Sequence, residues 1–320
     1  MKKWMRVAAL GLLAGLLAGG CAPRPAGEAK TVYIAQQFGT AYVPIALMKE
    51  AGLLQKHLPQ GVRAEWSQLG NTTAIREAML AGKADVGCMA IPPFLIGRDG
   101  GMPWKICAGI SDMPMGLVAR NPAYRTLADI TPQDRIALPQ PGSVQHILLA
   151  MAAWREWGQA DRFDNQLVTL NHPDGMSALL AGADVTLHFT TAPYLGRELQ
   201  EGMALLLTGQ DALGAPFTGI VAVAREAFQQ ESPRLYAAFL SALEEAMEQI
   251  RTQPRAVAEL LAPVYEMSAE ELLSEMTAEG AAYGAQVRGL SEFSGFMAQA
   301  GYLKEDRPVQ ELVFDGVDLP

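Results

Sequence analysis

Short apolar segments alternate with helical segments along most of this chain, and a polar turn follows nearly every apolar segment. This alternation is typical of an α/β fold with a parallel sheet covered by helices on both faces. In the first part of the chain, the expected strands are residues 31–35, 62–66 and 84–91. A helix is expected over residues 44–54, and a second helix should begin near Asn71 or Thr72.

The same order of strand, polar loop and helix returns in the middle of the chain. The expected strands are residues 135–139, 167–170 and 184–189. Ser143 precedes an apolar helical stripe and is a predicted N-cap, whereas His172-Pro-Asp174 is interpreted as a turn and cap. The two sets of elements predict two lobes of similar construction.

The last third of the chain changes to helices after a strand at 219–224. Ser232-Pro233 predicts an N-cap followed by proline at the first helical position. Ser268 and Glu271 have the spacing of a capping box. The apolar stripe of the long helix between them predicts a packing face, so this region should complete a core.

The N-terminal residues have the pattern of an export signal. A basic start, Met1 to Arg6, precedes an apolar run from Val7 to Leu17 and the small residues Ala18-Gly-Gly20. The run is too short to span a bilayer as a permanent helix. We therefore expect a signal peptide over residues 1–20. Cys21 directly follows the small residues, as in a bacterial lipobox.

Lipidation of Cys21 would anchor the mature protein to a membrane through a short tether, residues 21–29. Ala18 stands where the lipobox pattern prefers leucine. The alternative is a secreted chain in which this cysteine has no such role. In either case, the pattern predicts an extracytoplasmic protein, in the periplasm or at the cell surface.

Length and charge exclude several function classes. The chain has 320 residues, and about 300 remain after the signal, enough for two lobes with a sizeable core. Without the three basic residues of the signal, 22 basic residues face 34 acidic ones, a net charge of about −12. Such a surface repels nucleic acid and anionic lipid. A small anionic ligand stays possible, because local donors and helix ends decide its binding.

Two further cysteines, Cys88 and Cys107, each lie in an apolar segment that predicts a buried strand. An exported protein could join them in a disulfide, or they could remain two free thiols in the core. The sequence leaves both possibilities open. No Cys-x-x-Cys or His-x-x-x-His spacing indicates a metal site.

A family resemblance extends over nearly the whole mature chain. The segments that carry it are 35–40 (AQQFGT), 81–86 (AGKADV), 91–93 (IPP), 121–122 (NP), 127–129 (LAD), 134–139 (DRIALP), 171–174 (NHPD), 188–189 (HF) and 242–246 (ALEEA). In this order and spacing, the chain resembles the substrate-binding proteins of nitrate/sulfonate/taurine-type ABC importers, a group that also contains thiamine-pyrimidine binders.

The resemblance implies a type II periplasmic-binding-protein fold, in which two α/β lobes close on a ligand. One lobe would comprise residues 30–115 plus 218–320, and the other residues 116–217. The chain would cross between them near Gly116 to Arg120 and near Thr218 to Ala222. The implied protein is a monomer that needs no cofactor, captures a small molecule and delivers it to the transmembrane subunits of an ABC permease.

The candidate ligand residues lie in the loops after the expected strands, since such loops form the crevice of an open sheet. They are Gln37, Phe38, Tyr42, Asn71, Thr72, Thr73, Pro92, Ser143, Gln145, His188 and Thr191, with Pro93 shaping the same loop as Pro92. Each has a structural alternative. The polar residues could be ordinary helix caps, the aromatic residues could be core, and His188 is favoured as a structural histidine.

The ligand class stays open from the sequence. None of the candidate loops carries Arg or Lys, so a sulfonate or nitrate would be held by N–H groups, hydroxyls and helix dipoles. Alternatively, aromatic residues could clamp a heteroaromatic compound. The residues available for such a clamp are Phe38, Tyr42, Phe94 and Phe189.

Two other function classes are compatible with parts of this pattern. A tethered receptor that signals ligand occupancy to a sensor would have the same sequence features as an importer component. An exported enzyme could use Asp184 with His188, or Ser143 with His146, as catalytic pairs, but neither pair has a recognisable elbow or third partner. We therefore expect a binding protein and no catalytic residue.

Overall fold

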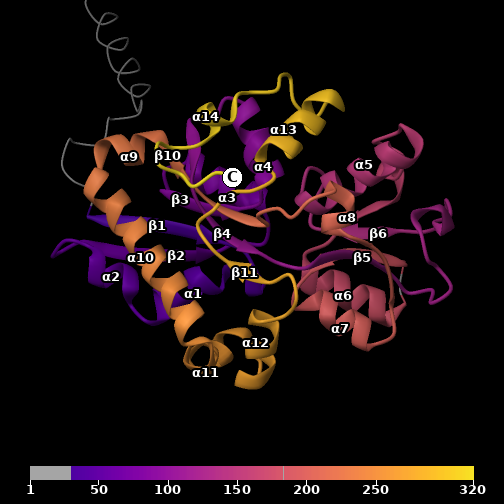
Figure 1. Cartoon of the computed structure of the whole chain (residues 1–320), viewed down its shortest axis with the longest axis horizontal. Helices are drawn as coiled ribbons and strands as arrows, with labels where there is room; N and C mark the ends of the chain where they lie inside the picture. The colour runs from indigo at the N-terminus through magenta and orange to yellow at the C-terminus, as the bar shows by residue number, and fades with distance from the viewer. Residues whose placement is uncertain (1–29, 183) are drawn as a thin grey trace, which may run out of the picture.

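The computed structural model describes residues 30–182 and 184–320. The expected signal peptide, the tether and Cys21 lie outside the described residues. Two separate sheets, each flanked by helices, make up the described part (Figure 1). None of the helices in residues 30–320 is both long and apolar enough to cross a membrane.

The first sheet has six strands in the order β11-β4-β10-β3-β1-β2. The strands are β1 (Thr31–Gln36), β2 (Arg63–Gln68), β3 (Val86–Met89), β4 (Trp104–Asp112), β10 (Ile220–Arg225) and β11 (Ala282–Tyr283). The helices that connect them are α1 (Val43–Glu50), α2 (Leu53–His57), α3 (Thr72–Leu80) and α4 (Ile91–Asp99), with the 3-10 helix η1 (Thr40–Tyr42) before α1.

The second sheet has five strands in the order β7-β6-β8-β5-β9. Its strands are β5 (Met115–Ala119), β6 (Ile136–Leu138), β7 (Leu167–Thr169), β8 (Leu187–Thr191) and β9 (Ala204–Thr208). Its helices are α5 (Val144–Trp157), α6 (His172–Ala181), α7 (Tyr194–Gln200) and α8 (Gly209–Leu213), with the 3-10 helices η2 (Leu127–Asp129) and η3 (Asp164–Gln166).

The α/β class and the expected order of strands and helices are confirmed, but the sheets are mixed where a parallel sheet was expected. β1, β2 and β3 run parallel, whereas β10 is antiparallel to both β3 and β4. In the second sheet β6, β7 and β8 run parallel, and β5 is antiparallel to β8 and β9. The antiparallel strands β5 and β10 are each the first strand after the chain changes sheet. Alternating apolar patterns do not encode strand direction, which explains the difference.

The chain changes sheet twice. The first change falls between Asp112 at the end of β4 and Met115 at the start of β5, directly before the segment Gly116 to Arg120 where the crossing was expected. The second falls between α8 and β10, which begins at Ile220. Thr218 lies in this second connection and donates its hydroxyl to the carbonyl of Gln286 (3.0 Å).

The C-terminal helices pack back on the first sheet. Figure 1 shows α10 lying across the side that also carries α1 and α2, while α13 and α14 lie beside α4. These helices are α9 (Glu226–Glu231), α10 (Pro233–Thr252), α11 (Pro254–Tyr265), α12 (Ala269–Met276), α13 (Leu290–Gln299) and α14 (Val309–Leu312). Their apolar faces bury Phe239 and Phe293 completely, so this region completes the core as expected.

Helix caps agree with the sequence in most places. Asn71, Ser143 and Ser268 are N-caps whose side chains accept a backbone N–H, and Ser268 also forms the capping box with Glu271. Ser232 precedes α10 as expected but makes no side-chain capping bond. Its φ of −136° and ψ of 54° place it outside the usual cap conformation, so only its position was predicted correctly.

Cys88 and Cys107 are buried free thiols. They lie on β3 and β4, which flank β10 on either side, and Ala222 of β10 pairs with both Cys88 and Ala108. Two strand spacings of roughly 4.8 Å each separate β3 from β4, a distance beyond the reach of a disulfide. The Cys107 thiol instead donates to the carbonyl of Ala222 (3.3 Å).

Candidate functional site

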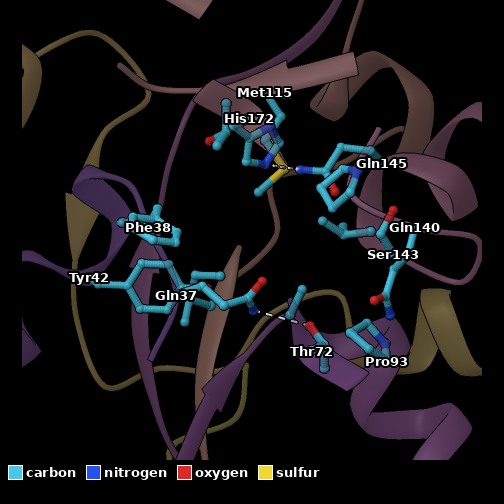
Figure 2. Close-up of a pocket in the computed structure, with 16 residues that line it drawn as sticks. Gln37, Phe38, Tyr42, Thr72, Pro93, Met115, Gln140, Ser143, Gln145 and His172 are labelled. Atoms are coloured by element: carbon cyan, nitrogen blue, oxygen red, sulfur yellow. Dashed lines mark hydrogen bonds between the residues drawn. The ribbon is translucent and has the colours of Figure 1, made fainter. Parts of the chain in front are cut away.

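A cleft lies where the two sheets face each other (Figure 2). It contains about 510 Å³ of empty space, part of it open to solvent. Its lining residues are Gln37, Phe38, Ala41, Tyr42, Thr72, Ala90, Pro93, Met115, Pro139, Gln140, Ser143, Val144, Gln145, His172, Thr191 and Ile220. The two sheets therefore contribute to one cavity.

The first-sheet side of the cleft combines a polar pair with two aromatic rings. Gln37 directly follows β1 and donates its side-chain N–H to the hydroxyl of Thr72 (3.1 Å). Asn71 caps α3 through the N–H of Ala74, so Thr72 becomes the first helical residue. Tyr42 is buried at 5 % exposure, whereas Phe38 stays 40 % exposed. An exposed ring at the cleft leaves apolar surface for a ligand to cover.

The second-sheet side is built on the starts of α5 and α6. Ser143 caps α5 by accepting the N–H of His146 (3.3 Å), which places Gln145 in the first turn. Asn171 caps α6 in the same way, and His172 is its first residue. In Figure 2 the side chains of Gln145 and His172 meet in the cleft, with Gln145 Nε2 and His172 Nε2 3.3 Å apart.

One hydrogen bond joins the two sides directly. The hydroxyl of Thr73, on α3, donates to Oε1 of Gln140, in the loop after β6 (3.2 Å). Close packing accompanies this bond, since a Cβ on Gly142 would lie 2.8 Å from Ile96 of α4. The described conformation is thus one in which both sides of the cleft are in contact.

The expected site residues fall into three groups in the structure. Seven line the cleft: Gln37, Phe38, Tyr42, Thr72, Ser143, Gln145 and Thr191. Asn71 and Thr73 do not belong to the lining. Asn71 caps α3, and Thr73 donates its hydroxyl to Gln140. Pro92 and His188 are buried outside the lining.

The two prolines open a helix and do not form the loop that was expected. Ile91, Pro92 and Pro93 are the first three residues of α4, where an N–H would have no partner inside the helix. Only Pro93 reaches the cleft. The expected aromatic clamp is also wrong in part, because Phe94 and Phe189 are fully buried and do not line the cleft.

His188 is a buried partner of Glu198. Both side chains are fully buried, and His188 Nδ1 lies 2.6 Å from Glu198 Oε1. Burial raises the pKa of Glu198 to about 8 and lowers that of His188 to about 3. Burial thus favours the uncharged form of both groups. His188 therefore has the surroundings of a structural histidine.

Sequence analysis missed His172, Gln140 and Met115 as lining residues. His172 was interpreted only as part of a turn and cap, yet it occupies the same place after its cap as Thr72 and Val144 do after theirs. In all three helices the residue after the N-cap lines the cleft. That shared position was visible in the sequence and was the signal that could have identified His172.

In the part of the chain that the structure describes, the cleft combines polar and apolar side chains and carries no fixed charge. Among the described residues, the sixteen that line it include no Asp, Glu, Lys or Arg. The starts of α3, α4, α5 and α6, each at least nine residues long, place the positive ends of their helix dipoles at the cleft. The N–H groups of Thr72, Thr73, Val144 and Gln145 lack partners within their helices because they occupy the first two helical positions. Such a site suits one negative charge.

The two pairs weighed for catalysis lack a catalytic geometry. Ser143 contacts the backbone N–H of His146, whose ring Nδ1 accepts from Gly142 and whose Nε2 lies 3.0 Å from Asp164. Asp184 is exposed on the surface, whereas His188 is fully buried with Glu198. Within the described residues there is also no group of three His, Cys, Asp or Glu side chains suited to a metal ion.

A family comparison decides the class of this chain. The profile of the NMT1-like family matches residues 25–264, three quarters of the sequence. The chain belongs to the NMT1-like family. No curated protein gives a significant sequence match.

Solved structures with the same fold include three binding proteins. The alkanesulfonate-binding protein SsuA from Xanthomonas axonopodis pv. citri, bound to MOPS, superposes with a TM-score of 0.74 at 20% identity, covering 90% of this chain and 99% of that one. The periplasmic aliphatic sulphonate binding protein SsuA from Escherichia coli gives 0.69 at 20% identity, covering 92% and 94%.

The periplasmic nitrate-binding protein NrtA from Synechocystis PCC 6803 gives a TM-score of 0.69 at 16% identity, covering 91% of this chain and 86% of that one. At these identities the likeness establishes the fold. This member of the NMT1-like family therefore has the periplasmic-binding-protein fold that the sequence predicted, with the cleft between its two halves.

Proposed function

We propose that this protein is the extracytoplasmic solute-binding component of an ABC importer and captures a small monoanion of the sulfonate or nitrate class. The observation that carries the proposal is the uncharged cleft onto which the starts of α3, α5 and α6 converge. Backbone N–H groups at long helix starts bind an anion without a cationic side chain. The fold shared with sulfonate-binding and nitrate-binding proteins supports the same class.

Capture would occur by closure of two lobes, residues 30–115 plus 218–320 and residues 116–217, about the two connections between the sheets. The bond from Thr73 to Gln140 belongs to the closed arrangement. The closed protein would then deliver its solute to the transmembrane subunits of a permease. We further propose that the mature protein is a monomer held at the membrane by lipid on Cys21.

The test is a thermal-shift screen of the protein after refolding to remove any bound solute. The panel contains methanesulfonate, taurine, nitrate, bicarbonate, thiamine pyrimidines and aromatic carboxylates. A solute that binds only the folded state stabilises it by about 2.7 kcal/mol at a hundredfold excess over Kd. A rise in Tm with sulfonates or nitrate supports the proposal. A rise only with uncharged compounds would contradict the anion class.

A heteroaromatic solute is the second candidate, and the exposed ring of Phe38 favours it. The ring is 40 % exposed at the cleft beside Tyr42, and stacking on a free aromatic face stabilises planar ligands. The thiamine pyrimidines in the panel test this candidate. Substitution Phe38→Ala separates the two classes, because it should weaken a stacked pyrimidine much more than methanesulfonate.

A further inference from the structure

His172 is distinctive among the residues that line the cleft. In the described part of the chain, it is the one lining side chain that can become a cation, since Lys and Arg are absent from the lining. Its position at the start of α6 is fixed by the Asn171 cap and by Pro173 behind it. A proton on this ring would add a full positive charge to a cleft that otherwise offers only dipoles.

Hydrogen bonds define which nitrogen of His172 is available. Nε2 lies 3.3 Å from Gln145 Nε2, so it accepts an N–H of that amide. Nδ1 therefore carries the ring proton and donates to the hydroxyl of Thr190 (3.3 Å). The ring stacks on Tyr194, with centroids 5.8 Å apart and planes 21° apart. Only Nε2, on the cleft side, is left to take up a further proton.

Within the described residues, the side chains in contact with the His172 ring include no carboxylate: they are Gln145, Thr190, His188 and Tyr194. The titratable or charged groups on the elements nearest to it are Asp174 on α6, His188 on β8, Tyr194, Arg197 and Glu198 on α7, and His146, Arg155 and Glu156 on α5, with Tyr42 on the first-sheet side and Tyr265 of α11 and Glu275 of α12 beyond α7.

The nearest of these groups is His188, whose ring centroid lies 5.7 Å from that of His172. Burial favours the uncharged form of His188 and of its partner Glu198. Burial, and secondarily His188, lowers the pKa of His172 to about 3 in the empty cleft. The neutral imidazole is therefore the resting state, and only an anion placed beside Nε2 would reverse this balance.

We propose that the cleft binds its anion together with one proton, taken from solvent onto His172 Nε2. This inference rests on the proposed function, because it requires an anionic solute. The new Nε2–H donates to the anion, and the displaced amide of Gln145 becomes free to donate its N–H to the same anion. Nδ1–H keeps its bond to Thr190. The solvent loses one proton, and no other bond changes.

Proton uptake on binding determines how the affinity for the anion changes with pH. Wherever the bound state holds one proton more than the free state, affinity falls tenfold for each unit of rising pH. Methanesulfonate and nitrate suit the test because neither titrates in this range. Affinity falls with rising pH between two pKa values of His172. The lower one is its pKa in the empty cleft, about 3, and the upper one is its higher pKa in the complex.

Isothermal titration of the intact protein with methanesulfonate and with nitrate tests the proposal. The buffers must be free of sulfonates and must differ in ionisation enthalpy, so that the observed heat reports the number of protons taken up. We expect uptake approaching one proton per anion at pH 5 and a five- to tenfold loss of affinity between pH 5 and pH 6. Anion binding without proton uptake would overturn the inference while leaving the proposed function intact.

Two variants test whether His172 is the residue that takes up the proton on anion binding. His172→Gln should bind the anion more weakly at pH 5 and with no dependence on pH, and a Tm for the empty variant near that of the wild type confirms folding. His57→Gln is the matched control. His57 lies at the end of α2, outside the cleft lining, and its Nε2 is 2.7 Å from Oε2 of Glu245 on α10. Persistent proton uptake in His172→Gln would also overturn the inference. Absence of anion binding in the wild type would contradict the proposed function itself.

Discussion

Thr73 and Gln140 form a hydrogen bond that connects the two halves of the molecule across the cleft. Thr73 lies on α3 beside the first sheet, Gln140 follows β6 of the second sheet, and their side-chain oxygens are 3.2 Å apart. A bond at this place exists only while the two halves are close together. It therefore stabilises the closed arrangement relative to any more open one.

Substitution Thr73→Val should weaken solute binding without affecting the fold. The bond is worth about 1 kcal/mol, so we expect roughly a fivefold higher Kd for methanesulfonate, mainly through faster release. Calorimetry and stopped-flow release measure both quantities. Thr169→Val, on the exposed edge strand β7, is the control and should leave the Kd unchanged. An unchanged Kd in Thr73→Val would show that this bond has no part in closure.

Thr72→Val tests the ligand contact at the first-sheet side. The hydroxyl of Thr72 accepts from Gln37 and keeps its own proton free for an anion in the cleft. Removing a hydrogen bond to a charged group costs about 1.5 to 3 kcal/mol, so the Kd should rise at least tenfold while Tm of the empty protein changes little. Thr169→Val again serves as the control. Full binding by Thr72→Val would place the ligand elsewhere.

Glu198 should make stability fall as pH rises. Its pKa is raised by burial to about 8 in the folded protein, so the folded state holds this proton more strongly than the unfolded state does. The stabilisation is complete below pH 4.5 and is lost as pH rises towards 8. At about 1.4 kcal/mol per pKa unit, the loss amounts to a few kcal/mol.

Denaturant unfolding of Glu198→Gln between pH 5 and pH 8 measures this contribution. The neutral amide cannot lose a proton, so the variant should lose less stability than the wild type over that range. Glu201→Gln, at an exposed position after α7, should behave as the wild type does. Equal pH dependence in Glu198→Gln and the wild type would mean that Glu198 is not protonated in the folded state.

Gly109 is required by close contact between β4 and the segment after β11. A Cβ at Gly109 would lie 2.3 Å from the carbonyl oxygen of Gln286 and 2.8 Å from that of Gly284. Gly109→Ala should destabilise the protein by about 1 to 3 kcal/mol, the usual cost of overpacking. Gly284→Ala has open space around its Cβ and is the matched control. Equal Tm values for the two variants would contradict this packing.

The sequence predicted the elements better than their arrangement. Asn71 and Ser143 are the caps that their patterns indicated, because capping depends on residues within one turn of the helix. The antiparallel direction of β5 and β10 was missed, since direction depends on where the chain changes sheet. The prolines at the start of α4 were assigned to a loop because proline is favoured both in turns and in a first helical turn.

The candidate site was predictable to the extent that it consists of strand-end loops. Gln37, Thr72 and Gln145 follow this rule and line the cleft. His188 does not, because its strand position alone did not show that Glu198 of the next helix would bury it. His172 was overlooked because the turn signal of Pro173 hid its place at the start of a helix.

The most direct test of anion capture in this cleft is a crystal structure of the protein grown with methanesulfonate. We expect one sulfonate between the starts of α3 and α5, within hydrogen-bond distance of the N–H groups there, of Thr72 Oγ1 and of His172 Nε2. A sulfonate bound only at other positions, with the cleft closed and holding water alone, would contradict this expectation.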